Sequence, residues 1–187
     1  HYKMLNEVYG SNKASIEKNL KPLTYGYTNY QFNSKNNAVR SLDMALNELI
    51  QLAKIHNDIG GILYPASGTY NYRVISGTGR LSPHSYGIAI DLKSDKRDYW
   101  KWSKEKEGEE RIKEYPKELV EVFEKNNFIW GGKWGYFDIL HFEYRPEIIL
   151  KAKYFTNSSD SKHWYEGFPI NENNQKLIEI IDDAIKD

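Results

Sequence analysis

The sequence predicts an α+β domain in which helices pack on one face of a small, mainly antiparallel sheet. Two hydrophobic patterns support this prediction. Apolar residues recur at helical spacing over 36–57, whereas they alternate with other residues over 88–92. Helices and a sheet with one apolar face each pack as layers around a shared core. At 187 residues the chain is long enough for one domain with such a core, so we expect a single domain over 1–187.

The predicted domain divides into three parts. Residues 1–33 are polar and tyrosine-rich, and glycine and proline interrupt them, so we expect an irregular N-terminal wrap. Residues 34–150 are expected to form the core of the domain. Residues 151–187 form a C-terminal loop and helix: aromatic residues gather over 154–173, and an amphipathic helix follows over 175–186. We expect that helix to clasp the domain.

The first element of the core is a helix over 36–57. Ser34 is a suitable N-cap for it, and the glycines Gly60 and Gly61 end it. His56 lies near the end of this predicted helix, where an imidazolium would complement the carbonyl dipole. We therefore assign His56 to the helix end and not to a metal site.

The later elements follow from local signals. A short helix is predicted over 116–127, because Pro116 suits a first helical turn and apolar residues follow at helical spacing. Residues 128–130 form a strand that leads into a glycine-rich turn. Another strand continues after His141 until Pro146 ends it.

The chain is organised around the segment 82–91, Ser-Pro-His-Ser-Tyr-Gly-Ile-Ala-Ile-Asp. Alternate apolar residues over 88–92 would face the core, which leaves Asp91 on the opposite face of a strand. Seven extended residues span roughly 23 Å, too far for His84 and Asp91 to share one ion. If they do share a metal, the chain must turn between them, and Gly87 permits that turn.

A second motif lies at 138–143, after the glycine-rich turn, and places Asp138 three residues before His141. Two neutral imidazoles and one carboxylate are the usual protein ligands of a catalytic zinc ion, with water in the fourth position. Asp138 would then lie close enough to act on that water. The chain has five histidines and no cysteine, so a thiolate zinc site is excluded.

These motifs resemble those of the zinc D-Ala-D-Ala peptidases of bacterial cell walls. That family includes VanY- and VanX-type enzymes and L-alanyl-D-glutamate peptidases. The pattern Ser-x-His-x-x-Gly-x-Ala-x-Asp, followed by Asp-x-x-His-Phe-Glu, carries the resemblance, which covers residues 61–145. The resemblance implies one zinc ion held by His84, Asp91 and His141, with Asp138 as the catalytic base.

The family also places an arginine before the first motif, where it holds a substrate carboxylate or the developing oxyanion. A planar guanidinium suits either role. We prefer Arg73, which lies in a strand-like run, over Arg80, which follows a predicted turn; either could also be a surface arginine. Ser82 and Glu143 are further candidates, for substrate binding or for orienting a ligand histidine. Glu143 could instead pair with Arg145.

The resemblance implies a zinc metallopeptidase that hydrolyses the peptide stem of bacterial peptidoglycan. We expect a D-alanyl-D-alanine carboxypeptidase, with an L-alanyl-D-glutamate endopeptidase of the same family as the alternative. A third hypothesis places the protein in a different functional class. It would be a zinc-bearing binding module without catalysis, as in hedgehog signalling domains that resemble these peptidases. Asp138 argues against this hypothesis, because a binding module needs no catalytic base.

Composition argues against two other classes of protein, nucleic-acid-binding proteins and membrane-spanning proteins. Lysine plus arginine equal aspartate plus glutamate at 26 each, which argues against nucleic-acid binding. No apolar run is long enough for a membrane-spanning helix.

Because the chain begins with His1, we expect that an export signal was removed and that the protein is extracellular or cell-wall associated. We expect a monomer. The charge-dense segment 93–114, which includes Trp100 and Trp102, is predicted to be a solvated face without a chemical role.

Overall fold

The computed structural model describes residues 2–155 and 163–184. It groups the chain into two compact units, His1–Arg145 and Pro146–Asp187. The sequence predicts a single domain over 1–187; we describe each of the two units by itself.

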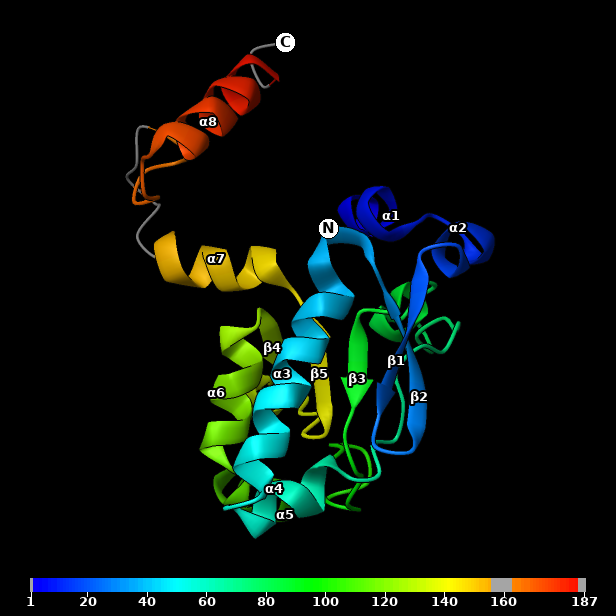
Figure 1. The fold of residues 1–187 in the computed structure, drawn as a ribbon. Coiled ribbons are helices and arrows are strands. Elements are labelled where there is room, and N and C mark those ends of the chain that lie inside the picture. Colours follow the sequence, from blue (N-terminus) through cyan, green and yellow to red (C-terminus); the bar gives the residue numbers. More distant parts are fainter. Residues whose placement is uncertain (1, 156–162, 185–187) are drawn as a thin grey trace. The chain divides into compact units, whose positions relative to one another are not determined.

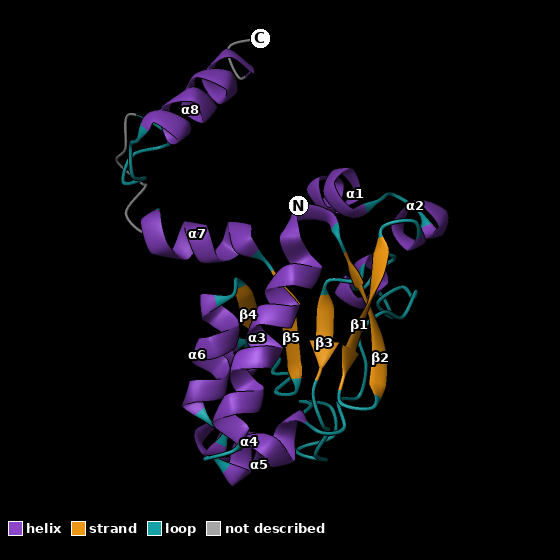
Figure 2. Cartoon of the chain, viewed as in Figure 1, coloured by secondary structure: helices purple, strands orange, loops and turns teal. Residues whose placement is uncertain are grey.

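The first unit combines helices with two small antiparallel sheets, as the α+β prediction required (Figure 1, Figure 2). Its helices are α1 (Tyr2–Tyr9), α2 (Lys13–Glu17), α3 (Ala38–Ala53), α4 (Asn57–Leu63), α5 (Glu105–Glu114) and α6 (Lys117–Lys125). Its strands are β1 (Leu20–Tyr25), β2 (Thr28–Asn33), β3 (Ala89–Asp91), β4 (Phe128–Trp130) and β5 (His141–Tyr144). Short 3-10 helices are η1 (Lys35–Asn37), η2 (Pro83–Tyr86) and η3 (Gly131–Lys133).

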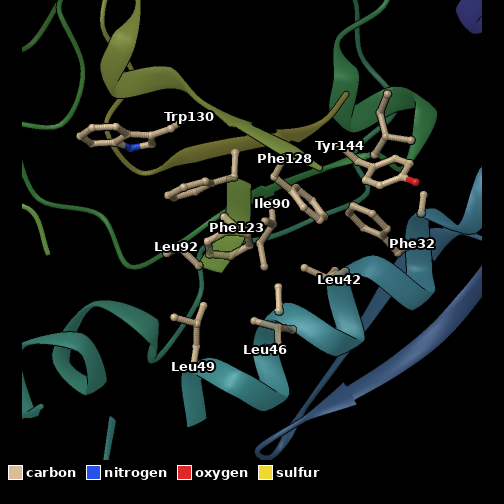
Figure 3. Packing of buried hydrophobic residues seen from close by; sticks show 14 of the residues in the cluster. Phe32, Leu42, Leu46, Leu49, Ile90, Leu92, Phe123, Phe128, Trp130 and Tyr144 are labelled. Carbon is tan, nitrogen blue, oxygen red and sulfur yellow. The ribbon is translucent and has the colours of Figure 1, made fainter. Parts of the chain in front are cut away.

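Strand β5 is the central strand of the three-stranded sheet, and it pairs antiparallel with both β3 and β4. Helices α3 and α6 lie side by side over this sheet (Figure 1). In Figure 3, Leu46 of α3 and Phe123 of α6 meet Ile90 of β3 in the core. Removing each such side chain from water contributes roughly 1.5–3 kcal/mol, so these contacts hold helices and sheet together.

Alternation along β3 separates the core from the opposite face of the sheet. Ile88, Ile90 and Leu92 are completely buried, as their spacing predicted. Because successive side chains of a strand point to opposite faces, Asp91 lies on the face turned away from α3 and α6. Phe142 of β5 is likewise in the core, which places His141 on the same face as Asp91.

Residues 2–33 are not the irregular wrap that their composition predicted. They form α1, α2 and an antiparallel hairpin of β1 and β2. These elements are short, so each offers too few apolar residues for a readable period, and tertiary contacts stabilise them instead. The side chains that anchor this region in the core are Leu5, Tyr9, Ile16, Tyr25, Tyr30 and Phe32.

The predicted helix over 36–57 is confirmed as α3, which ends at Ala53, and a separate helix, α4, begins at Asn57. Helix α3 has Asn37, in a left-handed conformation, at its N-cap, so Ser34 does not cap it. Gly60 does not end the helix but lies inside α4. A Cβ at Gly60 would lie 3.6 Å from that of Ala53, an ordinary van der Waals contact, so α4 packs beside α3 without needing glycine there. His56 is the N-cap residue of α4 and not a helix C-terminus.

The helix predicted from Pro116 and the strand after it are confirmed as α6 and β4.

The second unit contains α7 (Pro146–Tyr154) and α8 (Glu172–Ala184). Part of the predicted aromatic loop, 156–162, lies outside the described residues. In α8, Leu177 and Ile180 of the predicted stripe are exposed, and the clasp stays a prediction. None of the helices in the described ranges is both long and apolar enough to cross a membrane.

Candidate metal centre and cleft

Strand pairing brings Asp91 and His141 together. The antiparallel register of β3 and β5 places these residues directly opposite each other. Cross-strand partners present their side chains on the same face of a sheet. The Oδ1 atom of Asp91 accordingly lies 2.7 Å from the Nδ1 atom of His141. Two motifs that lie far apart in the sequence thus meet at one point.

His84 reaches the same point from η2. The Oγ atom of Ser82 accepts a hydrogen bond from the His84 amide at 3.3 Å and starts this turn. Gly87 ends it with a φ of 67°, so the predicted turn at this glycine is confirmed. The turn places His84 Nε2 3.2 Å from Asp91 Oδ2 and 3.2 Å from His141 Nδ1.

The partners of the two imidazoles determine which ring nitrogens carry hydrogen. His84 Nδ1 lies 2.5 Å from the carbonyl oxygen of Thr69, which can only accept, so Nδ1 carries the hydrogen and Nε2 presents its lone pair. His141 Nε2 lies 3.1 Å from Glu143 Oε1 and carries hydrogen by the same argument, so Nδ1 is the nitrogen that would offer a lone pair to a cation. Without a cation, Nδ1 lies 2.7 Å from Asp91 Oδ1 and carries a proton as well.

Three electron-rich groups therefore converge. A nitrogen of His84, a nitrogen of His141 and a carboxylate oxygen of Asp91 all lie within 4.8 Å of one another. Both histidines are buried, so water cannot easily screen these lone pairs. Facing acceptors need a cation between them, and this set of nitrogen and oxygen donors suits a divalent zinc ion.

Without a metal, a proton takes the place of that cation. Burial alone would lower the pKa of His141, but the carboxylates of Asp91 and Glu143 outweigh it and raise this pKa to about 10. Burial would raise the pKa of Asp91, but hydrogen bonds from His141 and His84 hold it well below its usual value. A metal ion at this centre competes with that proton, so metal binding would release it.

Glu143 connects the metal centre to a second ion pair. Its Oε2 atom accepts a hydrogen bond from Arg145 Nη1 at 3.0 Å, while its Oε1 atom faces His141. The two roles considered for Glu143 are therefore combined in one side chain. Burial alone would raise the pKa of Glu143, but His141 and Arg145 lower it, so the carboxylate stays charged.

Asp138 lies on the turn that precedes β5. Because the strand begins only at His141, Asp138 is outside the strict alternation of the sheet, and both side chains line one cleft. The turn is close-packed: the Asp138 amide donates to the Gly131 carbonyl at 3.0 Å. A Cβ at Gly131 would lie 2.3 Å from the Asp138 carbonyl oxygen, so this position requires glycine.

The Asp138 carboxylate has properties suited to accepting a proton. It does not belong to the converging donor group formed by His84, Asp91 and His141. Within 2–155 and 163–184, no side chain or backbone group makes a hydrogen bond to it. Burial raises its pKa to about 6, although the nearby histidines oppose this shift.

The cleft beside the donor group has a volume of about 260 Å³. It is lined by Arg73, Ile75, Ser82, Pro83, Asp91, Tyr99, Trp100, Trp134, Tyr136, Asp138, His141 and Glu143. Two further hollows adjoin it, because both also include Arg73 and Asp91. One extends to residues 67–71 and the other to Trp102. The cleft therefore continues away from Asp91 in more than one direction.

The two candidate arginines lie in different places. Arg73 lines all three hollows, with an exposed side chain. Its backbone is held in place, since the Arg73 amide donates to Ser85 Oγ at 2.7 Å. The Arg80 guanidinium lies 5.2 Å from the ring centre of Tyr2 and lines none of the three hollows.

Sequence reasoning missed the aromatic side of the cleft. Segment 93–114 was predicted to be a solvated face, but Tyr99 and Trp100 line the main cleft and Trp102 lines the adjoining hollow. The prediction followed the charges of this segment. Tryptophans within such a polar run were the available signal, because a solvated face has no need for large aromatic side chains.

Fold and site together define a candidate metal-dependent hydrolase of the α+β class. Its candidate metal ligands are His84, Asp91 and His141, and the carboxylate of Asp138 lies in the same cleft. Residues 76–144 match the family model described as D-alanyl-D-alanine carboxypeptidase. The chain is 30% identical over 112 residues to the peptidoglycan L-alanyl-D-glutamate endopeptidase CwlK of Bacillus subtilis (strain 168). This match covers 58% of the chain and 65% of that relative, less than two thirds of its length. No solved structure matches the chain. Residues 76–144, which include the donor group and Asp138, are thus similar to this family of cell-wall peptidases.

Proposed function

We propose that this protein is a zinc-dependent peptidase that hydrolyses the peptide stem of bacterial peptidoglycan. The observation that carries the proposal is the convergence of donor atoms from His84, Asp91 and His141 beside the partly buried carboxylate of Asp138, which accepts no hydrogen bond from the residues that the structure describes. The match of residues 76–144 to the peptidase family model supports the reaction class, and the name of the CwlK relative supports the substrate. Since that substrate is part of the cell wall, we also propose an extracellular or wall-associated location.

The residues present fit a zinc ion. His84 Nε2, His141 Nδ1 and one Asp91 oxygen would hold it, and Thr69 and Glu143 would fix the two rings through their other nitrogens. Three protein ligands leave one position for water, as a catalytic centre needs. When bound, zinc supplies Lewis acidity that lowers the pKa of water and polarises a peptide carbonyl.

The chain's own groups would then move the protons. Asp138 takes a proton from the attacking water, because its raised pKa makes it a stronger base than an ordinary aspartate. The protonated Asp138 afterwards donates to the nitrogen of the leaving amine. The Arg73 guanidinium, at the junction of the hollows, stabilises the negative charge that develops on the carbonyl oxygen.

The shape of the cleft favours cleavage within the stem over removal of its last residue. A carboxypeptidase needs a closed end where a cation holds the terminal carboxylate. Arg73 instead lies where the hollow of 67–71 and the aromatic hollow meet, which leaves room for peptide on both sides of Asp91. We therefore propose an L-alanyl-D-glutamate endopeptidase, the activity in the name of the CwlK relative. D-Ala-D-Ala carboxypeptidase activity, favoured from the sequence, is the second candidate and has the family description in its support.

Digestion of a synthetic stem pentapeptide by the zinc-loaded protein, with mass analysis of the products, tests these proposals. An endopeptidase releases the first alanine and tolerates an amidated C-terminus, whereas a carboxypeptidase releases the last alanine and loses activity on the amidated peptide. Protein stripped of metal with a chelator is the control. If the zinc-loaded protein cleaves neither peptide nor intact peptidoglycan, the chain is a zinc-bearing binding module and the proposal fails.

A further inference from the structure

Large aromatic side chains stand exposed along one side of the cleft. Trp102 and Tyr136 are 68% and 72% exposed, and Trp100 and Trp134 are 37% and 36% exposed. Such side chains release free energy when they are covered, so their exposure around a ligand cleft indicates a binding surface. We call Tyr99, Trp100, Trp102, Trp134 and Tyr136 the aromatic rim.

The aromatic rim is built from two loops that are joined to each other. The Trp100 amide donates to the Phe137 carbonyl at 3.1 Å, and the Ile139 amide donates to the Asp98 carbonyl at 2.7 Å. Tyr99 and Asp138 pair across the two loops as an isolated β-bridge. The rim is therefore held at a fixed place relative to Asp138, the proposed base.

Ring contacts join the members of the rim in pairs and place Trp134 at the donor group. The Trp134 ring centre lies 5.6 Å from that of His141, at the donor group. The Trp100 and Tyr136 centres are 4.7 Å apart, and the Tyr99 and Trp102 centres are 5.1 Å apart. Lys101 already lies 5.3 Å from the ring centre of Trp100, so the broad free surfaces are those of Trp102 and Tyr136.

The size of this surface exceeds what a stem peptide requires. Alanine and glutamate, the residues in the name of the CwlK relative, present a methyl group and a carboxylate. Neither can cover several indole and phenol rings. The other component of peptidoglycan is a sugar polymer, whose pyranose rings have a flat face of C–H groups and a polar edge. The C–H face carries a small positive charge that complements the negative face of an aromatic ring.

We propose that the aromatic rim is a subsite for the N-acetylated sugar rings of the glycan strand next to the stem being cut. Trp102 and Tyr136 stack on the sugar rings, while Arg73 and Asp138 contact the peptide within the adjoining hollows. This inference deepens the proposed function and rests on it for the link to peptidoglycan. It makes the glycan a determinant of specificity in addition to the peptide.

Sugar binding can be measured without hydrolysis. Calorimetric titration of the full chain with a soluble chito-oligosaccharide, a polymer of N-acetylglucosamine, should detect binding. Trp102→Ala and Tyr136→Ala should each weaken it by about fivefold to tenfold, the range of a single stacking contact. Tyr27→Ala is the matched control, because Tyr27 is fully exposed on the β1–β2 turn and belongs to none of the hollows described. It should bind the sugar as the parent does.

Turnover supplies the second measurement. The ratio of kcat/KM for a stem peptide that carries its sugars to kcat/KM for the same peptide without them should fall in both rim variants and stay unchanged in Tyr27→Ala. No sugar binding by the parent, unchanged binding in the variants, or an equal loss on both substrates would each overturn the glycan subsite. If the protein cleaves neither substrate, the proposed peptidase function fails, and the binding titration alone decides the subsite.

Discussion

The Nε2 atom of His141 lies 3.1 Å from the Oε1 atom of Glu143, a residue on the same strand and the same face of the sheet. This contact points the Nδ1 atom of His141 towards Asp91 and His84, which completes the donor group. Arg145 holds the other oxygen of Glu143 at 3.0 Å, so the carboxylate cannot rotate away. The orientation of one proposed metal ligand thus depends on two residues that would not touch the metal.

Glu143→Gln should therefore weaken zinc binding without removing a ligand. A neutral amide makes the imidazole less basic, and loss of such a partner typically lowers metal affinity by about 10- to 100-fold. Competition with a chromogenic chelator measures the affinity, and circular dichroism shows whether the variant is folded. Glu118→Gln, an exposed change on α6, is the control and should bind zinc as the parent does. Unaltered affinity in a folded Glu143→Gln protein would refute the orienting role.

The donor group predicts the metal stoichiometry. Purified protein should contain about one zinc ion per chain, since the three ligands form a single centre. His84→Ala should lose most of it, because two remaining ligands bind zinc weakly. His56→Ala and His163→Ala are matched controls with exposed imidazoles, and both should keep their zinc. Loss of zinc from either control, or full retention in His84→Ala, would contradict the assignment.

Asp138→Asn should separate catalysis from metal binding. The amide cannot accept the water proton, and removal of a general base typically lowers the rate by roughly 10²-fold or more. Zinc content and thermal stability should stay close to those of the parent, because Asp138 lies outside the donor group. Asp58→Asn, at an exposed position of α4, controls for the change itself. Peptide hydrolysis at the parental rate would rule out the base.

The pH dependence of kcat/KM should follow the protonation of Asp138. A base works only when deprotonated, so activity falls as the pH drops through its pKa. Burial raises that pKa to about 6 in the metal-free protein, and a bound cation nearby would lower it. The acid limb should therefore have its midpoint at or below pH about 6. Zinc content must be measured at each pH, since protons also compete for the ligands. A midpoint well above that value, with zinc still bound, would contradict the assignment.

Arg73→Ala should lower kcat/KM by about 10- to 100-fold, the equivalent of one charged hydrogen bond. Arg73→Lys should recover only part of this loss, because an ammonium lacks the planar pair of donors. Arg80→Ala is the matched control, since Arg80 lies against Tyr2 and outside the three hollows. The reverse result, an active Arg73→Ala protein and an inactive Arg80→Ala protein, would transfer the role to Arg80.

Local sequence signals predicted the elements that hold the centre. Alternation over 88–92 identified the core-facing side of β3, and Gly87 marked the turn that brings His84 back. Strand β5 begins only at His141, so the strict alternation that would separate His141 from Asp138 does not apply. These features depend on residues that are close in sequence, so they can be predicted from the sequence alone.

The sequence by itself thus determined the residue types and order of the candidate centre, through spacing and local conformation. Only the tertiary structure decided which side chains come together at this centre and its cleft. The register of β3 on β5 set Asp91 opposite His141, and two joined loops brought Tyr136 to the main cleft and Trp102 to an adjoining hollow, both of which include Arg73. Register and loop packing depend on burial of side chains from the whole core, for which no short stretch carries the information. For the same reason the sequence wrongly predicted irregular chain for residues 2–33. Contacts with distant residues stabilise the small helices and the hairpin that form there.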